Sequence, residues 1–130
     1  MARSFEELDA YQAARAFRVR ICRLTRLLPA HEKNVLRLQM RRAALSLTNC
    51  IAEGHGSRSY RHNRSYLYRS RGSLQELCDD LNMCEDEDYF PKVQLDDLRK
   101  DAERVAMLIN GYIGYLSRCI AAGKTQEEKE

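Results

Sequence analysis

Five arginines and three tyrosines stand close together between residues 51 and 73, IAEGHGSRSYRHNRSYLYRSRGS. The arginines are Arg58, Arg61, Arg64, Arg69 and Arg71, and the tyrosines are Tyr60, Tyr66 and Tyr68. No acidic residue occurs between Glu53 and Glu76. A guanidinium group offers forked donors that match a phosphate, and a tyrosine ring stacks on an unpaired base. The stretch is therefore a candidate surface for nucleic acid, with RNA slightly favoured.

A second interpretation of the same stretch stays open. The arginines would form the solvated side of a helix and pair with acids from later helices, because basic stretches are common and no named nucleic-acid motif is present. Arginines elsewhere in the first half of the chain are candidates to extend a binding surface: Arg41 and Arg42, and also Arg15, Arg23 and Arg26.

The overall charge hides a strong asymmetry. Net charge is +3, yet residues 1–75 carry 15 Lys and Arg against 5 Asp and Glu, whereas residues 76–130 carry 7 against 14. Folding brings distant helices together and partly mixes the two signs. The asymmetry therefore favours an anionic partner without establishing one.

Catalytic and metal-binding patterns are weak. Cys78 and Cys84 are six residues apart, no C-x-x-C occurs, and the histidines lie near expected turns. The glycines of GHGSRS join two helices, so they do not form a dinucleotide loop. We expect no enzymatic activity, no metal or other cofactor, and no small-molecule substrate.

The sequence GHGSRS also predicts a tight turn between two helices. Gly54 is expected to end a helix as a left-handed cap. Glu53 lies in the last helical turn, where the dipole disfavours an anion, so an ion pair or hydrogen bond with Arg58 or Arg71 is expected to fix the turn.

Hydrophobic periodicity predicts four helices, at about residues 5–28, 32–53, 58–87 and 92–121. Residues spaced by three and four form the expected core stripes; the stripe of the second helix consists of Leu36, Met40, Ala43, Leu47 and Ile51. Ser4 and Glu7 form a capping box, and Ser57 or Ser59 caps the third helix. The fold class is all-α, an up-down-up-down antiparallel bundle in one domain of residues 1–122, with a disordered tail at 123–130.

Some apolar or small residues are expected to face away from this core. Leu38 and Leu45 lie seven residues apart on the second helix, and Gly72 and Met83 lie on the third. Exposed apolar residues are ordinary, but this alignment favours packing between subunits.

The expected location is the cytoplasm. The start, MARSFEELDA, lacks the apolar segment of a signal peptide, and no run is long enough to span a membrane. Five scattered cysteines suit free thiols in a reducing compartment.

Two segments resemble a known family. RRAALSLTNCIAEGHGSRS (41–59) and SRGSLQELCDDL (70–81) are similar to four-helix-bundle proteins encoded in intervening sequences of bacterial large-subunit ribosomal RNA genes. Their pattern has Arg-Arg-Ala-Ala, Ile-Ala-Glu-Gly and Arg-Gly-Ser-Leu runs, and the resemblance extends over about residues 4–118. His55 stands where the family has an aromatic residue, and Asn63 where it has a large apolar one.

The resemblance implies a homo-oligomer, with a pentameric ring as the expected arrangement. It also implies kinship with accessory proteins of diversity-generating retroelements, which work with a reverse transcriptase and nucleic acid. Three functions follow as hypotheses: a nucleic-acid-binding oligomer, a protein-interaction scaffold whose basic and acidic faces hold the ring together, or an accessory subunit of a nucleic-acid enzyme.

Overall fold

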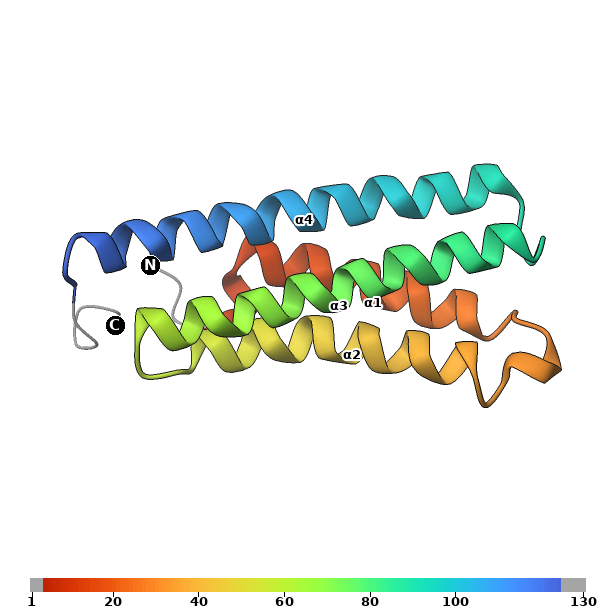
Figure 1. The fold of residues 1–130 in the computed structure, drawn as a ribbon, viewed down its shortest axis with the longest axis horizontal. Coiled ribbons are helices and arrows are strands. Elements are labelled where there is room, and N and C mark those ends of the chain that lie inside the picture. Colours follow the sequence, from red (N-terminus) through yellow and green to blue (C-terminus); the bar gives the residue numbers. More distant parts are fainter. Residues whose placement is uncertain (1–3, 125–130) are drawn as a thin grey trace.

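Four long helices form the protein in a computed structural model that describes residues 4–124. They are α1 (Asp9–Thr25), α2 (Leu36–His55), α3 (Tyr60–Asp86) and α4 (Lys92–Ala121). Two short 3₁₀ helices, Phe5–Glu7 and Ala30–Glu32, precede α1 and α2. In Figure 1, successive helices are joined at alternating ends of an elongated bundle. α2 packs against α1 and α3, and α4 packs against α3 and α1. The all-α fold with four helices agrees with the prediction from sequence.

The core follows the predicted apolar stripes. On α2, Met40, Leu47 and Ile51 are fully buried, and on α4 the buried residues run from Leu95 to Cys119. Side chains three and four residues apart share one helical face, so each helix contributes one line of contacts to the centre. The periodicity that predicted the helices therefore also identified the core.

The first helix differs from the prediction at its start. A single helix was expected from residue 5, but Phe5–Glu7 is a 3₁₀ turn and Leu8 is extended, with φ −69° and ψ 131°. The Ser4 side chain accepts a hydrogen bond from the Glu6 amide, one residue before the amide that the predicted capping box uses. α1 begins at Asp9 and ends at Thr25, three residues before the expected end.

The second helix was expected from Glu32 but begins at Leu36. Glu32 is buried, and the Tyr89 hydroxyl donates a 2.6 Å hydrogen bond to its Oε2. His31 Nε2 lies 3.0 Å from the same hydroxyl. The hydrogen bond to Glu32 raises the pKa of Tyr89 to about 12. It holds the segment before α2 against the turn between α3 and α4, so the helix starts one turn later.

The other helix ends agree more closely. α3 is capped by Ser59, whose Oγ accepts from the His62 amide at 3.1 Å. α4 begins directly after Pro91 and ends at Ala121, as predicted. Gly123 follows with φ +72°. The rest of the expected tail, residues 125–130, lies outside the described residues.

The prediction that Gly54 ends α2 in a left-handed conformation is wrong. Gly54 lies inside the helix, which continues to His55. Its role is to allow a close approach of α3: a Cβ at this position would lie 2.7 Å from Asn63 Oδ1 and 2.9 Å from Tyr66 Cβ. Glycine is required here by the close contact with the next helix, and not by a positive φ angle.

A polar network lies where α2 ends and α3 begins. Asn63 Nδ2 donates to the Tyr112 hydroxyl at 2.9 Å, and His55 Nδ1 lies 3.4 Å from the same oxygen. Asn63 is fully buried, and its Oδ1 has no hydrogen-bond partner among residues 4–124. The network links α2, α3 and α4 just below the start of α3.

Candidate nucleic-acid interface

The start of α3 presents two exposed arginines. Arg58 precedes the helix and Arg61 lies in its first turn, and both are exposed. Ser57 Oγ donates to the Gly54 carbonyl at 2.6 Å, which fixes the turn that carries Arg58. A helix N-terminus has free amides and the positive end of the dipole. These cations therefore stand where an anion is already favoured.

Three further residues form a row on the side of α3 that faces α4. The Arg64 and Arg71 guanidinium carbons lie 6.0 and 5.1 Å from the centroid of the Tyr68 ring. Arg64 Nη1 donates to Ser117 Oγ at 3.1 Å, and Arg71 Nη1 donates to Asn110 Oδ1 at 3.0 Å. Both acceptors are neutral, so the two positive charges remain uncompensated.

A second pair lies on the side of α3 that faces α2. The Arg69 guanidinium carbon lies 5.3 Å from the centroid of the Tyr66 ring. Tyr66 is half-buried, and its Cβ lies against Gly54. The arginines predicted from the sequence are thus divided between two sides of one helix.

Tyr60 does not belong to the surface. Its side chain is 4% exposed and forms part of the core, so a base cannot stack on it. Tyr68 is 45% exposed and keeps the predicted role available. The two rings are eight residues apart, about 80° around the helix, which turns Tyr60 inward and Tyr68 outward.

Ion pairs gather elsewhere in the bundle. Arg20 of α1 pairs with Asp97, at 2.7 Å, and with Asp101 of α4. Arg99 pairs with Glu85 at 2.6 Å and with Asp96, which raises the pKa of Arg99. Ion pairs within residues 4–124 join Arg20 to Asp97 and Asp101, Arg99 to Glu85 and Asp96, and Lys92 to Asp96. The arginines between residues 58 and 71 have no carboxylate partner in that set.

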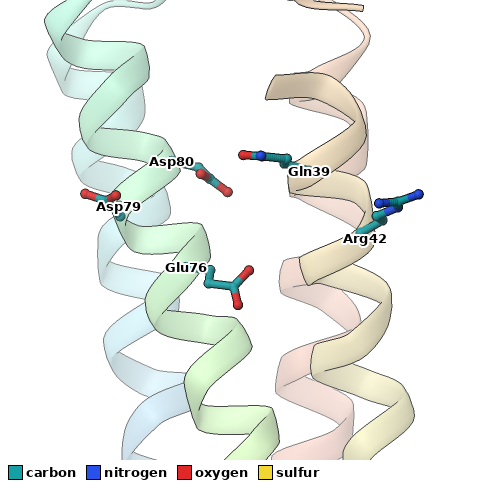
Figure 2. Close-up of a pocket in the computed structure, with 5 residues that line it drawn as sticks. All are labelled: Gln39, Arg42, Glu76, Asp79 and Asp80. Carbon is teal, nitrogen blue, oxygen red and sulfur yellow. The ribbon is translucent and has the colours of Figure 1, made fainter. Parts of the chain in front are cut away.

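Arg42 lies apart from this basic region. It lines a groove between α2 and α3 with one amide and three acids: Gln39, Glu76, Asp79 and Asp80. Figure 2 shows Glu76 and Asp80 extending toward α2 and Arg42 turned away from them. Burial, followed by the charges of Asp79 and Glu76, raises the pKa of Asp80 to about 6. Arg41, one position earlier, is exposed about 100° around the helix.

Comparison with known proteins adds the family. A family described as "23S rRNA-intervening sequence protein" matches residues 6–111. The chain belongs to this family. The match covers most of the chain and includes all of α1, α2 and α3. No curated protein sequence matches the chain.

In this family member, the turn after α2 is held differently from the prediction. Glu53 is exposed, and within residues 4–124 no ion pair connects it to Arg58 or Arg71. The contacts that fix the turn come from Ser57, Ser59 and the close approach at Gly54. The expected electrostatic anchor is replaced by hydrogen bonds and packing.

The residues predicted to pack between subunits of this family member are exposed on the single chain. Leu38 is 44% exposed, Leu45 is 53% exposed and Met83 is 38% exposed. A Cβ at Gly72 would meet nothing within 4 Å. Gly72 therefore serves no close contact inside the bundle, and the oligomer interface stays a prediction.

Sequence reasoning missed Asn110 and Ser117, the α4 residues that hold Arg71 and Arg64. One signal could have drawn attention to them: residues 104–124 contain no Asp or Glu. A helical segment that lacks carboxylates and is long enough to pack along the basic half of the previous helix is a candidate partner for it.

The described residues were also compared with the requirements for a metal site and for a membrane-spanning helix. Among residues 4–124, no group of His, Cys, Asp and Glu side chains is arranged to hold a metal ion. Nor does any helix in that range have the length and apolar composition needed to cross a membrane.

Proposed function

We propose that this protein is a non-enzymatic, homo-oligomeric nucleic-acid-binding bundle. The observation that carries the proposal is the absence of carboxylate partners, within residues 4–124, for Arg58, Arg61, Arg64, Arg69 and Arg71. The acids that do form ion pairs within residues 4–124, Glu85, Asp96, Asp97 and Asp101, pair with Arg20, Arg99 and Lys92. A cluster of uncompensated guanidinium groups attracts a polyanion, and release of the polyanion's counterions drives binding.

Binding is mainly electrostatic in this proposal. Arginine presents several N–H donors in one plane, which suits phosphate oxygens. Arg58 and Arg61 add their charge to the dipole at the start of α3. Tyr68 supplements these contacts by stacking on a base. RNA is slightly favoured among the candidate ligands, because stacking of a base on an exposed ring such as Tyr68 is typical of RNA and single-strand recognition.

The oligomer is part of the proposal. Leu38, Leu45 and Met83 leave apolar surface exposed, and Gly72 lets a neighbouring subunit approach α3 closely. A pentameric ring is the arrangement that we propose, because it is the one expected for the family. Repetition of the basic region around a ring multiplies the phosphate contacts available to one strand.

The test uses purified, nuclease-treated protein. Binding to labelled structured RNA, single-stranded DNA and duplex DNA is measured from low to physiological salt, and light scattering gives the mass of the same samples. We expect an intact oligomer whose affinity falls steeply as salt rises. For each phosphate contact, the logarithm of the affinity falls by about 0.7–0.9 for every tenfold rise in salt concentration. Failure to bind any of the three at low salt overturns the proposal.

A protein-interaction scaffold is the second candidate, and the groove between α2 and α3 favours it. Glu76, Asp79 and Asp80 line it, and α2, its other wall, also carries the exposed Leu38 and Leu45. In a scaffold, arginines of one subunit meet these acids of another, so high salt dissociates the ring. In a nucleic-acid-binding ring, high salt releases the nucleic acid and leaves the mass unchanged. An accessory subunit of a nucleic-acid enzyme needs both the basic surface and a protein-binding surface. In that case the protein binds nucleic acid and also retains the enzyme.

A further inference from the structure

We propose that one edge of the basic region is a track for an unpaired nucleic-acid strand, and that Tyr68 is its base-stacking residue. This inference rests on the proposed function. The α3–α4 edge is defined here by residues of α3 and the residues of α4 beside them: Arg61, Arg64, Tyr68, Arg71, Asn110 and Ser117. The opposite side of α3, which faces α2, is not part of the track.

The two sides of α3 differ in their acids. Along the α3–α4 edge both helices lack carboxylates, because residues 54–75 and residues 104–124 contain no Asp or Glu. On the other side lie the exposed Glu53 of α2 and the groove that contains Glu76 and Asp80. A chain of phosphates is attracted along the first side and repelled on the second.

Two arginines of the edge, Arg64 and Arg71, are ordered before any ligand arrives. Each guanidinium group has five N–H donors. Arg64 gives one hydrogen bond to Ser117, and Arg71 gives one to Asn110, while both also lie against the Tyr68 ring. Most donors therefore remain available for phosphate. Part of the entropy cost of ordering two long side chains is already met by neutral contacts that leave their charge intact.

Spacing places a ring between two cations. Residues four and three apart lie on one helical face, so Arg64, Tyr68 and Arg71 form a line along α3. The ends of this line are separated by about 10 Å along the axis, given a rise of 1.5 Å per residue. A strand lying on this line has phosphates near both arginines and a base near Tyr68.

This arrangement selects unpaired nucleotides. In a duplex the bases are stacked on each other and their faces are covered, so a ring on the outside of a helical bundle reaches only phosphates and sugars. In a single strand the base face is free and stacks on an exposed aromatic ring. Tyr68 offers such a ring, whereas Tyr60 is buried and Tyr66 is packed against Gly54.

The decisive experiment compares Tyr68→Ala with Tyr68→Phe in the full-length oligomer. The probes are an RNA strand of CA repeats about 20 nucleotides long and the duplex that it forms with its complement. Loss of one stacked base weakens single-strand binding by about tenfold in Tyr68→Ala. Tyr68→Phe keeps the ring and binds like the wild type, and duplex affinity is the same in all three proteins. Tyr115→Ala, which removes a partly exposed tyrosine from another face of α4, is the matched control and leaves both affinities unchanged.

Each outcome has a separate meaning. If neither probe binds at low salt, the proposed function itself fails. If both bind but Tyr68→Ala weakens them equally, or not at all, the strand track is overturned while nucleic-acid binding stands. Circular dichroism and light scattering exclude loss of fold or assembly as the cause.

Photo-crosslinking locates the strand independently. A CA-repeat strand carrying 4-thiouridine at single positions is irradiated in the complex, and the attached peptide is identified by mass spectrometry. We expect attachment within residues 60–71 of α3 or 110–118 of α4. Attachment confined to α2, at residues 36–55, overturns the track even if Tyr68→Ala reduces affinity.

Discussion

Along α3, the half from Tyr60 to Arg71 carries arginines and no carboxylate, whereas the half from Leu74 to Asp86 carries carboxylates and no arginine. The acidic half is tied to the rest of the bundle by Arg99, which bonds Glu85 and Asn82. In the basic half, Arg64 and Arg71 contact the Tyr68 ring and donate to the neutral side chains of Ser117 and Asn110, and Arg69 contacts the Tyr66 ring. Figure 1 places the two halves toward opposite ends of the bundle.

The difference shows how charge is used in this molecule. Where acids and bases alternate between α3 and α4, they form bridges that are partly exposed and contribute little individually, typically below about 1 kcal/mol. Where arginines have no carboxylate partner, they repel one another, and their contacts with tyrosine rings and neutral acceptors contribute only about 0.5–1 kcal/mol each. Three of these side chains, Arg64, Arg69 and Arg71, are nevertheless held by tyrosine rings or neutral acceptors, which is the arrangement expected of a surface that binds an anion.

The largest expected effect comes from removing charge in the basic half. The variant Arg58→Ala/Arg61→Ala/Arg64→Ala loses three phosphate contacts, which lowers affinity for RNA by roughly 100- to 1,000-fold at low salt. The dependence of log affinity on log salt also becomes shallower by about 2 units. Filter binding over a salt series measures both quantities.

The matched control for this variant removes the same charge from α1. Arg15 and Arg23 are exposed on α1 and Arg26 is exposed directly after it. The sequence made them candidates to extend the binding surface, but α1 packs against α2 and α4, so Arg15→Ala/Arg23→Ala/Arg26→Ala is expected to leave affinity much closer to the wild type. Equal losses in the two triple variants would mean that net charge alone governs binding. The contrast between the two halves of α3 would then carry no functional meaning.

Alanine substitutions at two glycines, Gly54 and Gly72, are expected to change the free energy of unfolding in opposite directions. Gly54→Ala places a Cβ 2.7 Å from Asn63 Oδ1 and 2.9 Å from Tyr66 Cβ, and overpacking of this kind costs about 1–3 kcal/mol. Gly72→Ala meets nothing and gains helix propensity, so it raises the free energy of unfolding by about 0.5–1 kcal/mol. Urea unfolding monitored by circular dichroism measures both.

If Gly72→Ala instead destabilises the protein, the result indicates a contact between subunits at this position. The single chain has room for this methyl group, so the loss must come from contact between subunits. Light scattering then distinguishes the cases, because a weakened interface lowers the mass at dilute concentration.

Periodicity was enough to predict four helices, the core stripe of α2 and the bounds of α4, because burial of an apolar face dictates all of them. It was not enough at Gly54. A left-handed cap and a close helix approach both require glycine. Only the position of Asn63 on the next helix shows which of the two explains Gly54.

The candidate site was predictable as a composition but not as a geometry. The arginines and tyrosines of α3 are visible in the sequence, yet which of them face α4 depends on where α4 lies. Tyr60 was expected at the surface and is buried, and Arg42 was expected beside the other arginines and lies among three acids. Both differences arise from packing between helices that are distant in sequence.

The smallest effect concerns the acidic groove and its dependence on pH. Burial beside Asp79 and Glu76 raises the pKa of Asp80 from 3.8 to about 6, so the folded protein disfavours the ionised form. Folding is therefore opposed by this charge above pH 6, and the opposition disappears as pH falls below 4. Asp80→Asn stabilises the protein by about 1 kcal/mol at pH 8, after allowance for solvent screening, and by nothing at pH 4.

Urea unfolding at several pH values tests this sign, with Asp86→Asn, an exposed residue at the end of α3, as the control that changes stability little at either pH. The groove contains one cation, Arg42, and Figure 2 shows its side chain directed away from the carboxylates. If Asp80→Asn instead destabilises the protein at pH 8, the carboxylate has a cationic partner, supplied by a rotated Arg42 or by a neighbouring subunit. A dependence of that loss on protein concentration identifies the subunit, because only association responds to concentration. The acidic half of α3 would then be the surface that holds the oligomer together, and the basic half would remain free for nucleic acid.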